Sequence, residues 1–210
     1  MSIFFQQAIA NIKQTGSFIP SSDFLATKMV DKIDFNKNLN ILELGAGEGI
    51  FTRHILAKIT AKSSLTSCEI NSSLFTEIAK IRDHRFKPKM ECVFDRYIYD
   101  SFVQCSVDCI ISAIPLANIK RKKKKYLLDS CFELLKPGGL FVQFQYLPQD
   151  YKRIKKTFGN IKLGFTLFNF PPAFIYYAYK PLENKKVIEQ KDEINILNQC
   201  YNYYTMDKVQ

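Results

Sequence analysis

The stretch Leu42-Glu43-Leu44-Gly45-Ala46-Gly47-Glu48-Gly49 joins a short apolar run, Asn40–Leu44, to a segment with helical periodicity over 48–59. Its three glycines allow the backbone to turn tightly and to approach a ligand closely. A helix that begins at such a turn offers free N–H groups to a carboxylate or a phosphate. The stretch therefore predicts a strand, a ligand-binding loop and a helix in direct succession.

Strands and helices alternate through the residues that follow this loop. Two strand-like runs near the end, 161–168 and 173–179, are separated by Asn169-Phe170-Pro171-Pro172 and fit an antiparallel pair at the sheet edge. This order predicts an α/β fold, a Rossmann-like and mostly parallel sheet with an antiparallel C-terminal strand pair and helices on both faces. The remaining expected strands are 65–70, 91–94, 107–111 and 140–146, and the remaining expected helices are 72–81 and 120–135.

The two ends of the chain differ from this alternating region. Residues 1–35 contain an amphipathic pattern broken at Gly16 and Pro20, followed by a second apolar pattern, and predict a helical extension or cap. Residues 36–180 are expected to form one ligand-binding domain. Residues 181–210 are polar and predict a tail outside that domain.

The composition fits a globular domain, since 47% of the 210 residues are hydrophobic and 24% are charged. The net charge of +10 indicates an anionic partner, either nucleic acid or an anionic membrane surface. No apolar run reaches the roughly 18–20 residues of a membrane span, and no secretory signal is evident. We therefore expect a cytoplasmic protein that meets a membrane only from its surface.

The cysteines and histidines give no sign of a metal site. Six cysteines are present without a Cys-x-x-Cys pair, and the chain has only two histidines. A zinc site needs three or four closely placed ligands of these types. We expect no bound metal, and we expect buried thiols in a reducing compartment.

Acidic residues accompany the ends of three successive expected strands. Glu43 lies two residues before the first glycine, where a carboxylate would repel a pyrophosphate and favour a ligand with an ammonium and a sulfonium. Glu69, at the end of the next strand, is placed to accept hydrogen bonds from both hydroxyls of a ribose. Asp95, after the third expected strand, is a candidate acceptor for an adenine amino group. The three positions predict an adenosyl site at the carboxyl edge of the sheet.

The glycine stretch resembles motif I of class I methyltransferases, and Cys68-Glu69-Ile70-Asn71 resembles their ribose-binding strand end. Four further segments resemble bacterial phospholipid N-methyltransferases, which are relatives of the ribosomal RNA adenine dimethyltransferases. Two segments depart from the usual sequences of this family. Phe94-Asp95-Arg96 stands where the family often has Gly-Asp-Ala, and residues 112–116, Ser-Ala-Ile-Pro-Leu, stand where it often has Ser-Gly-Leu-Pro-Leu. The four segments are 15–22, 112–116, 135–146 and 170–173.

The resemblance implies the Rossmann-like sheet of class I methyltransferases and S-adenosylmethionine as cofactor. It also implies a lid over the cofactor or the substrate, formed by Phe18, Ile19, Pro20 and Ser21. The cofactor-binding residues that follow from the motifs and the resemblance are Glu43, Gly45, Ala46, Gly47, Gly49, Glu69, Ile70, Asp95 and Ser112.

The resemblance implies methylation of a phospholipid amine such as that of phosphatidylethanolamine. An amine nucleophile must lose a proton, and Tyr146, after the expected fifth strand, is the candidate acceptor. Methylation of RNA adenine is the first alternative, but the segment 112–116 lacks the Asn or Asp and the aromatic residue typical of such enzymes. A protein that binds S-adenosylmethionine without catalysis is the second alternative.

Two groups of residues are candidates for contact with an anionic membrane surface at the inner face of the membrane. The basic run at the start of the expected helix 120–135 contributes charge, and the first amphipathic segment contributes apolar side chains. The sequence leaves the oligomeric state open. The candidates are Phe4, Phe5, Ile9, Arg121, Lys122, Lys124 and Lys125.

Overall fold

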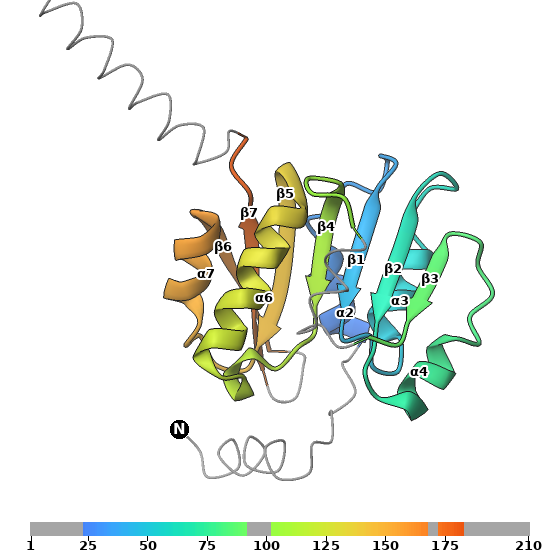
Figure 1. The fold of residues 1–210 in the computed structure, drawn as a ribbon, viewed down its shortest axis with the longest axis horizontal. Coiled ribbons are helices and arrows are strands. Elements are labelled where there is room, and N and C mark those ends of the chain that lie inside the picture. Colours follow the sequence, from blue (N-terminus) through green and yellow to red (C-terminus); the bar gives the residue numbers. More distant parts are fainter. Residues whose placement is uncertain (1–22, 92–101, 168–171, 183–210) are drawn as a thin grey trace, which may run out of the picture.

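The computed structural model describes residues 23–91, 102–167 and 172–182. In this part of the chain, seven strands form one sheet in the order β3-β2-β1-β4-β5-β7-β6 (Figure 1). The strands are β1 (Asn40–Leu44), β2 (Ser64–Cys68), β3 (Phe86–Lys89), β4 (Val107–Ser112), β5 (Leu135–Gln145), β6 (Asn160–Thr166) and β7 (Ala173–Tyr179). The helices are α2 (Asp23–Val30), α3 (Ile50–Leu56), α4 (Ser72–Ile78), α6 (Arg121–Leu134) and α7 (Tyr151–Phe158), with a short 3₁₀ helix η1 (Leu116–Asn118).

The strand directions confirm the predicted sheet. β1 lies at the centre, parallel to β2 on one side and to β4 on the other, and β3 and β5 continue the parallel arrangement. β7 is antiparallel to both β5 and β6, so the C-terminal pair closes one edge. The chain adds β2 and β3 on one side of β1 and then adds β4 and β5 on the other side, so the strand order reverses between β1 and β4. Ligands of open α/β sheets bind at such a point.

Helices cover both faces of the sheet, as the alternation predicted. α2 and α3 bury Leu25, Met29 and Phe51 against one face, in one apolar cluster with Ile41 of β1. α6 and α7 cover the other face, where Phe158 stacks on Phe141 at a centroid distance of 5.0 Å. β1 and β4 are therefore buried on both faces, which explains why their sequences lack polar alternation.

The third strand lies earlier than predicted. β3 is Phe86–Lys89, whereas the expected run 91–94 begins at Glu91, which has no regular structure, and continues outside the described residues. Pro88 in β3 has no N–H to donate, which an edge strand tolerates because only one side of it is paired. Asp95 was assigned from the misplaced strand, and it lies outside the described residues.

Two further elements differ from the expectation. β5 begins at Leu135 and not at 140, because the ladder with β4 starts at the pair Val107 and Leu135. α7 was not predicted, since only Ile154 and Phe158 of its eight residues are buried and the rest is mostly basic.

The expected N-terminal extension shares residues with the core of the domain. Within the expected extension 1–35, α2 contributes fully buried side chains to the main core. Residues 1–22 and most of the expected tail lie outside the described residues. Among the helices that the structure describes, none combines the length and apolar character needed to cross a bilayer.

Candidate functional site

The glycine loop is fastened to the strands on both sides of β1 at the carboxyl edge of the sheet. The N–H groups of Gly45 and Ala46 donate to the Cys68 carbonyl at the end of β2, at 2.9 and 3.0 Å. The Ala113 N–H, just after β4, donates to the Leu44 carbonyl at 2.9 Å. The ends of three neighbouring strands therefore form one rigid rim around the loop.

The glycines of this loop have two different structural roles. Gly49 precedes α3 with a φ of 80°, and a Cβ there would lie 2.9 Å from Cγ2 of Ile78, so glycine allows α3 to approach α4. Gly47 has a φ of 56°, but no described atom lies within 4 Å of the position that its Cβ would take. The requirement for glycine at Gly47 is thus conformational, and the space beside it is open among the described residues.

Glu69 lies directly after β2 and is nearly buried. Its Oε2 accepts a hydrogen bond from the Gly47 N–H at 2.7 Å, and its Oε1 accepts one from the Asn71 N–H at 2.8 Å. An ionised carboxylate has about four acceptor positions, so each oxygen keeps capacity for a further donor such as a hydroxyl. The adjacent Ile70 is 66% exposed and presents an apolar side chain at the same rim.

Glu43 is fully buried in β1, with its side chain toward α3. Its Oε2 accepts hydrogen bonds from the hydroxyls of Thr52, at 2.6 Å, and Ser67. Its Oε1 is buried without a hydrogen-bond partner among the described residues. Burial raises the pKa of Glu43, while the two hydroxyl donors oppose this effect. A buried carboxylate whose second oxygen has no partner among the described residues fits a cationic ligand group. The contact with an ammonium and a sulfonium stays a prediction.

Ser112 ends β4 opposite Leu44, and its fully buried hydroxyl accepts a hydrogen bond from the Ile114 N–H at 3.4 Å. Sequence reasoning missed its neighbour Gln143 of β5. The Gln143 Nε2 donates to the Ile114 carbonyl at 3.0 Å, and its Oε1 is buried without a partner among the described residues. A polar residue within the apolar run 140–144 was the available signal, and the structure shows that it supports the loop after β4.

Tyr146 follows the last residue of β5 and is partly buried. Its ring meets Phe144 edge-on at 5.8 Å, and Phe144 meets Phe51 of α3 at 6.0 Å. The tyrosine thus belongs to the sheet face that carries α3 and the Glu43 side chain. Its role as proton acceptor stays a prediction.

One predicted membrane contact is wrong. Lys124 is only 8% exposed, and its Nζ lies 2.8 Å from Oδ1 of the buried Asp150 at the start of α7. Lys124 therefore joins α6 to α7, while Arg121, Lys122 and Lys125 on the same helix are exposed. The other expected contacts, Phe4, Phe5 and Ile9, and the expected lid, 18–21, lie outside the described residues.

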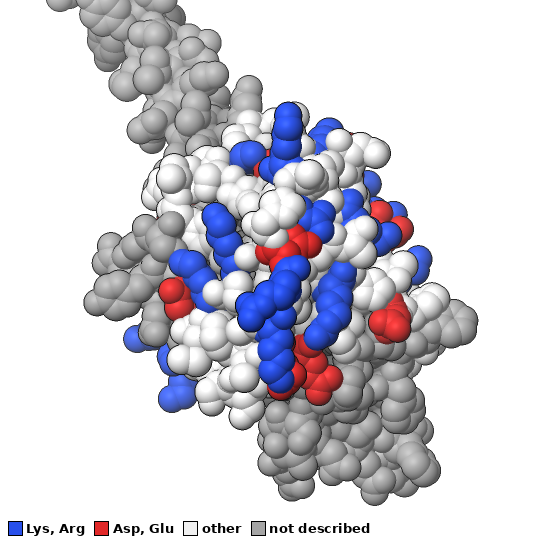
Figure 2. Space-filling view, turned by 90° about the vertical axis from the view of Figure 1, so that its right-hand side faces the viewer, with Lys and Arg blue, Asp and Glu red and all other residues white. Residues whose placement is uncertain are grey.

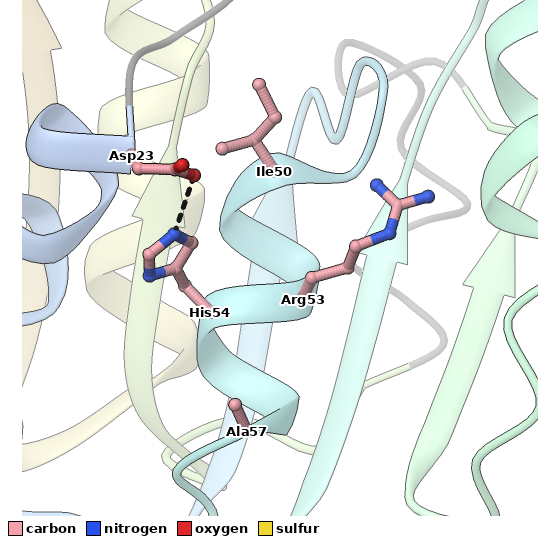
Figure 3. Close-up of a pocket in the computed structure, with 5 residues that line it drawn as sticks. All are labelled: Asp23, Ile50, Arg53, His54 and Ala57. Carbon is pink, nitrogen blue, oxygen red and sulfur yellow. Dashed lines mark hydrogen bonds and ion pairs between the residues drawn. The ribbon is translucent and has the colours of Figure 1, made fainter.

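A surface pocket of about 290 Å³ lies on the outer side of α3 (Figure 3). Its lining is Asp23, Ile50, Arg53, His54 and Ala57, and Nε2 of His54 lies 3.1 Å from Oδ1 of Asp23. Neither the Glu43 nor the Glu69 side chain lines it, but Ile50 directly follows Gly49 of the glycine loop, and Arg53 donates a hydrogen bond to the Glu48 carbonyl. In the described ranges, no cluster of three or more metal-ligating side chains is found.

Comparison with known proteins gives one family match and several similar proteins. Residues 10–104 match the family model of the ribosomal RNA adenine dimethylases. The ornithine lipid N-methyltransferase of Singulisphaera acidiphila is 25% identical over 172 residues, which cover 77% of this chain and 86% of that protein. The fusarielin synthase FSL1 of Gibberella zeae is 33% identical over 132 residues, but these are 61% of this chain and only 5% of that protein.

Solved structures show the same fold. An S-adenosylmethionine-dependent O-methyltransferase from Thermotoga maritima superposes with a TM-score of 0.56 at 16% identity, over 86% of this chain and 72% of that one. The sheet order, the family match and the acidic and glycine positions at the sheet edge agree with one another. The chain belongs to the class I S-adenosylmethionine-dependent methyltransferases.

Proposed function

We propose that the protein transfers a methyl group from S-adenosylmethionine to the amine of a phospholipid headgroup, such as phosphatidylethanolamine, at a membrane surface. The observation that carries this proposal is the similarity to an ornithine lipid N-methyltransferase along 86% of that enzyme's length. The segments 112–116 and 135–146 add the resemblance to phospholipid N-methyltransferases. The first begins at the end of β4, and the second spans β5 and Tyr146, which follows it.

The cofactor is proposed to lie along the rim of the glycine loop and to supply an electrophilic methyl group. Glu43 would hold a cationic group through its unpaired Oε1, and Glu69 would accept hydrogen bonds from ribose hydroxyls. Among the described residues no atom fills the space beside Gly47, and this space is proposed to receive the ligand. The same proposal covers Gly45, Ala46, Gly49, Ile70 and Ser112, which lie at this rim, and Asp95 and the lid residues, which are outside the described residues.

The acceptor amine is proposed to approach from the ends of β4 and β5. The Gln143 side chain holds the Ile114 carbonyl from inside the sheet, which fixes the course of the segment that follows β4. Tyr146, directly after β5, is the proposed proton acceptor for the amine, directly or through water. Because displacement at a sulfonium needs little activation, positioning of the amine is the main task of these residues.

Methylation of RNA adenine is the second candidate, favoured by the dimethylase family match over residues 10–104 and by the net charge of +10. The segment after β4 argues against it. The residue that follows Pro115 is Leu116, which is fully buried in η1 and has no aromatic ring to stack on a flipped base. The lipid amine therefore remains the favoured acceptor.

A labelled-methyl assay separates these candidates. The purified full chain is incubated with radiolabelled S-adenosylmethionine and either phosphatidylethanolamine vesicles or total RNA. We expect label in a chloroform-soluble product from the vesicles, lost in Glu69→Ala and kept in Glu48→Gln, whose side chain is exposed on the same loop. Label only in ribonuclease-sensitive material would establish the RNA alternative, and cofactor binding without any transfer would establish a non-catalytic protein.

A further inference from the structure

A row of exposed apolar side chains marks the outer edge strand β6. Leu163 is 45% exposed and Phe165 is 50% exposed, and Leu167, just beyond the strand, is 70% exposed. Alternate residues of a strand point to the same face, so Leu163 and Phe165 lie on one face, and Leu167 follows directly after the strand ends. Edge strands in soluble proteins usually carry charges that prevent association, and an apolar row there indicates a contact surface.

The row lies on the sheet face that carries α6 and α7. Ile161, two residues before Leu163, packs in the same apolar cluster as Ile154 and Phe158 of α7. In Figure 1, α6 and α7 stand side by side in front of the sheet, with β6 behind α7. The apolar row therefore adjoins the surface of α7.

That neighbouring surface is strongly basic. α7 reads Tyr-Lys-Arg-Ile-Lys-Lys-Thr-Phe and contains no acidic residue. Its lysines Lys152, Lys155 and Lys156 are exposed, and Lys122 of α6 is also exposed. The surface around β3, the edge strand on the other side of the sheet, differs from this. Basic and acidic side chains are interspersed there (Figure 2), for example in the Arg85–Asp83 pair at 2.6 Å.

The apolar row reaches the same sheet edge as the candidate site. Phe165 of β6 pairs with Phe174 of β7, and Phe174 pairs with Gln145, the last residue of β5. The rings of Phe165 and Phe174 lie 4.9 Å apart between centroids. Only β7 therefore separates the row from the end of β5, after which Tyr146 follows.

We propose that Leu163, Phe165 and Leu167, with the basic residues of α7, form a docking strip that seats the carboxyl edge of the sheet on an anionic phospholipid bilayer. The apolar side chains would enter the interface, and the lysines would lie at the lipid phosphates. A second copy of the chain fits less well, because both partners would bring the same basic surface and a net charge of +10. The inference rests on the proposed lipid substrate, whose headgroup lies at that depth.

Vesicle co-sedimentation of the full chain tests the docking strip without any methyl acceptor. The vesicles are phosphatidylcholine alone or phosphatidylcholine mixed with the anionic phosphatidylglycerol, and neither contains an amine acceptor. Phe165→Ser with Leu167→Ser should weaken binding to the anionic vesicles at least about tenfold. Lys152→Glu with Lys155→Glu should weaken it by about fivefold or more per residue.

Matched controls come from the opposite, amino edge of the sheet. Val103 is 77% exposed before β4, and Lys62 is exposed before β2, so Val103→Ser and Lys62→Glu should bind as the wild type does. Circular dichroism confirms that every variant is folded. Equal losses in the control and strip variants would overturn the docking strip, as would unchanged binding in the strip variants.

Two further measurements separate this inference from the proposed function. Activity on detergent-solubilised phosphatidylethanolamine should survive in the strip variants, since the strip acts on the bilayer and not on the reacting amine. Loss of that activity in folded variants would overturn the assigned role. If the wild type sediments with anionic vesicles but methylates no lipid, the docking strip stands while the proposed substrate fails. A wild-type dimer that Phe165→Ser with Leu167→Ser dissociates, seen by analytical ultracentrifugation, would instead assign the strip to self-association.

Discussion

Replacing Glu43 with glutamine should weaken cofactor binding and stabilise the empty protein at neutral pH. Glutamine keeps the shape of the side chain and one oxygen for the hydroxyls of Thr52 and Ser67, but it removes the charge. A hydrogen bond to a charged group contributes about 1.5–3 kcal/mol. We therefore expect Glu43→Gln to bind S-adenosylmethionine about 10- to 150-fold more weakly.

The stability effect has the opposite sign because burial raises the pKa of Glu43. The folded protein then holds this proton more tightly than the unfolded chain does. As the pH rises from the ordinary carboxyl pKa of about 4.3 to the raised value, the free energy of unfolding falls, by at most about 1.4 kcal/mol per pH unit. Glu43→Gln lacks this loss, so it should be more stable than the wild type at pH 8, with a smaller difference at pH 5.

Isothermal titration calorimetry and urea unfolding measure the two effects separately. Adenosylhomocysteine, which keeps the ammonium but lacks the sulfonium, should lose affinity too if Glu43 binds the ammonium. Glu48→Gln is the control, since Glu48 is exposed on the same loop. Wild-type affinity in Glu43→Gln, or a stability difference that does not grow between pH 5 and pH 8, would refute this account of the buried carboxylate.

Three further perturbations test the rim and the packing around it. Gly47→Ala should cost about 1–2 kcal/mol in urea unfolding, because its φ is 56°, and should weaken cofactor binding at least about tenfold in calorimetry; wild-type affinity would contradict the open space assigned there. Lys124→Met removes the nearer of two cations beside the buried Asp150, since Nε of Arg153 stays 3.5 Å from its Oδ1, and should cost about 1.5–3 kcal/mol in urea unfolding. The exposed Lys122→Met should stay within about 0.5 kcal/mol. Asp83→Asn removes a carboxyl whose pKa is lowered by the Arg85 guanidinium. The wild type should therefore have the higher Tm at pH 6 and should lose this advantage as the pH falls below about 3.9. An equal Tm difference at pH 6 and at pH 2 would refute this role of the Asp83 charge.

The glycine stretch and its acidic partners were predictable because their geometry is local. A strand, a tight turn and a helix follow from neighbouring residues, and Glu43 and Glu69 are each fixed by a position next to a strand end. The alternation of strands and helices then predicts parallel neighbours whose carboxyl ends meet at one edge. The structure adds that Oε1 of Glu43, which has no hydrogen-bond partner in the part of the chain that the structure describes, is buried at this edge. No sequence pattern indicates this.

Errors arose where residues distant in sequence decide the outcome. The strand at Phe86–Lys89 pairs with β2 despite its proline, because the edge of the sheet offers a backbone partner there. Lys124 belongs to a run of six basic residues, 120–125, and only the packing of α6 on α7 shows that it meets the buried Asp150. The hydrogen bond from Gln143 to the Ile114 carbonyl depends on the pairing of β4 with β5, which the sequence alone does not specify.

The sequence by itself determined the α/β class, the glycine loop and the two acidic strand ends, because helix and strand periodicity and glycine conformation depend on neighbouring residues. Tertiary structure alone decided which lysine is buried, where the edge strand lies and that Leu163, Phe165 and Leu167 form one exposed row beside a basic helix. Those features depend on contacts between elements far apart in the chain, whose burial free energy overrides the preference of any single residue.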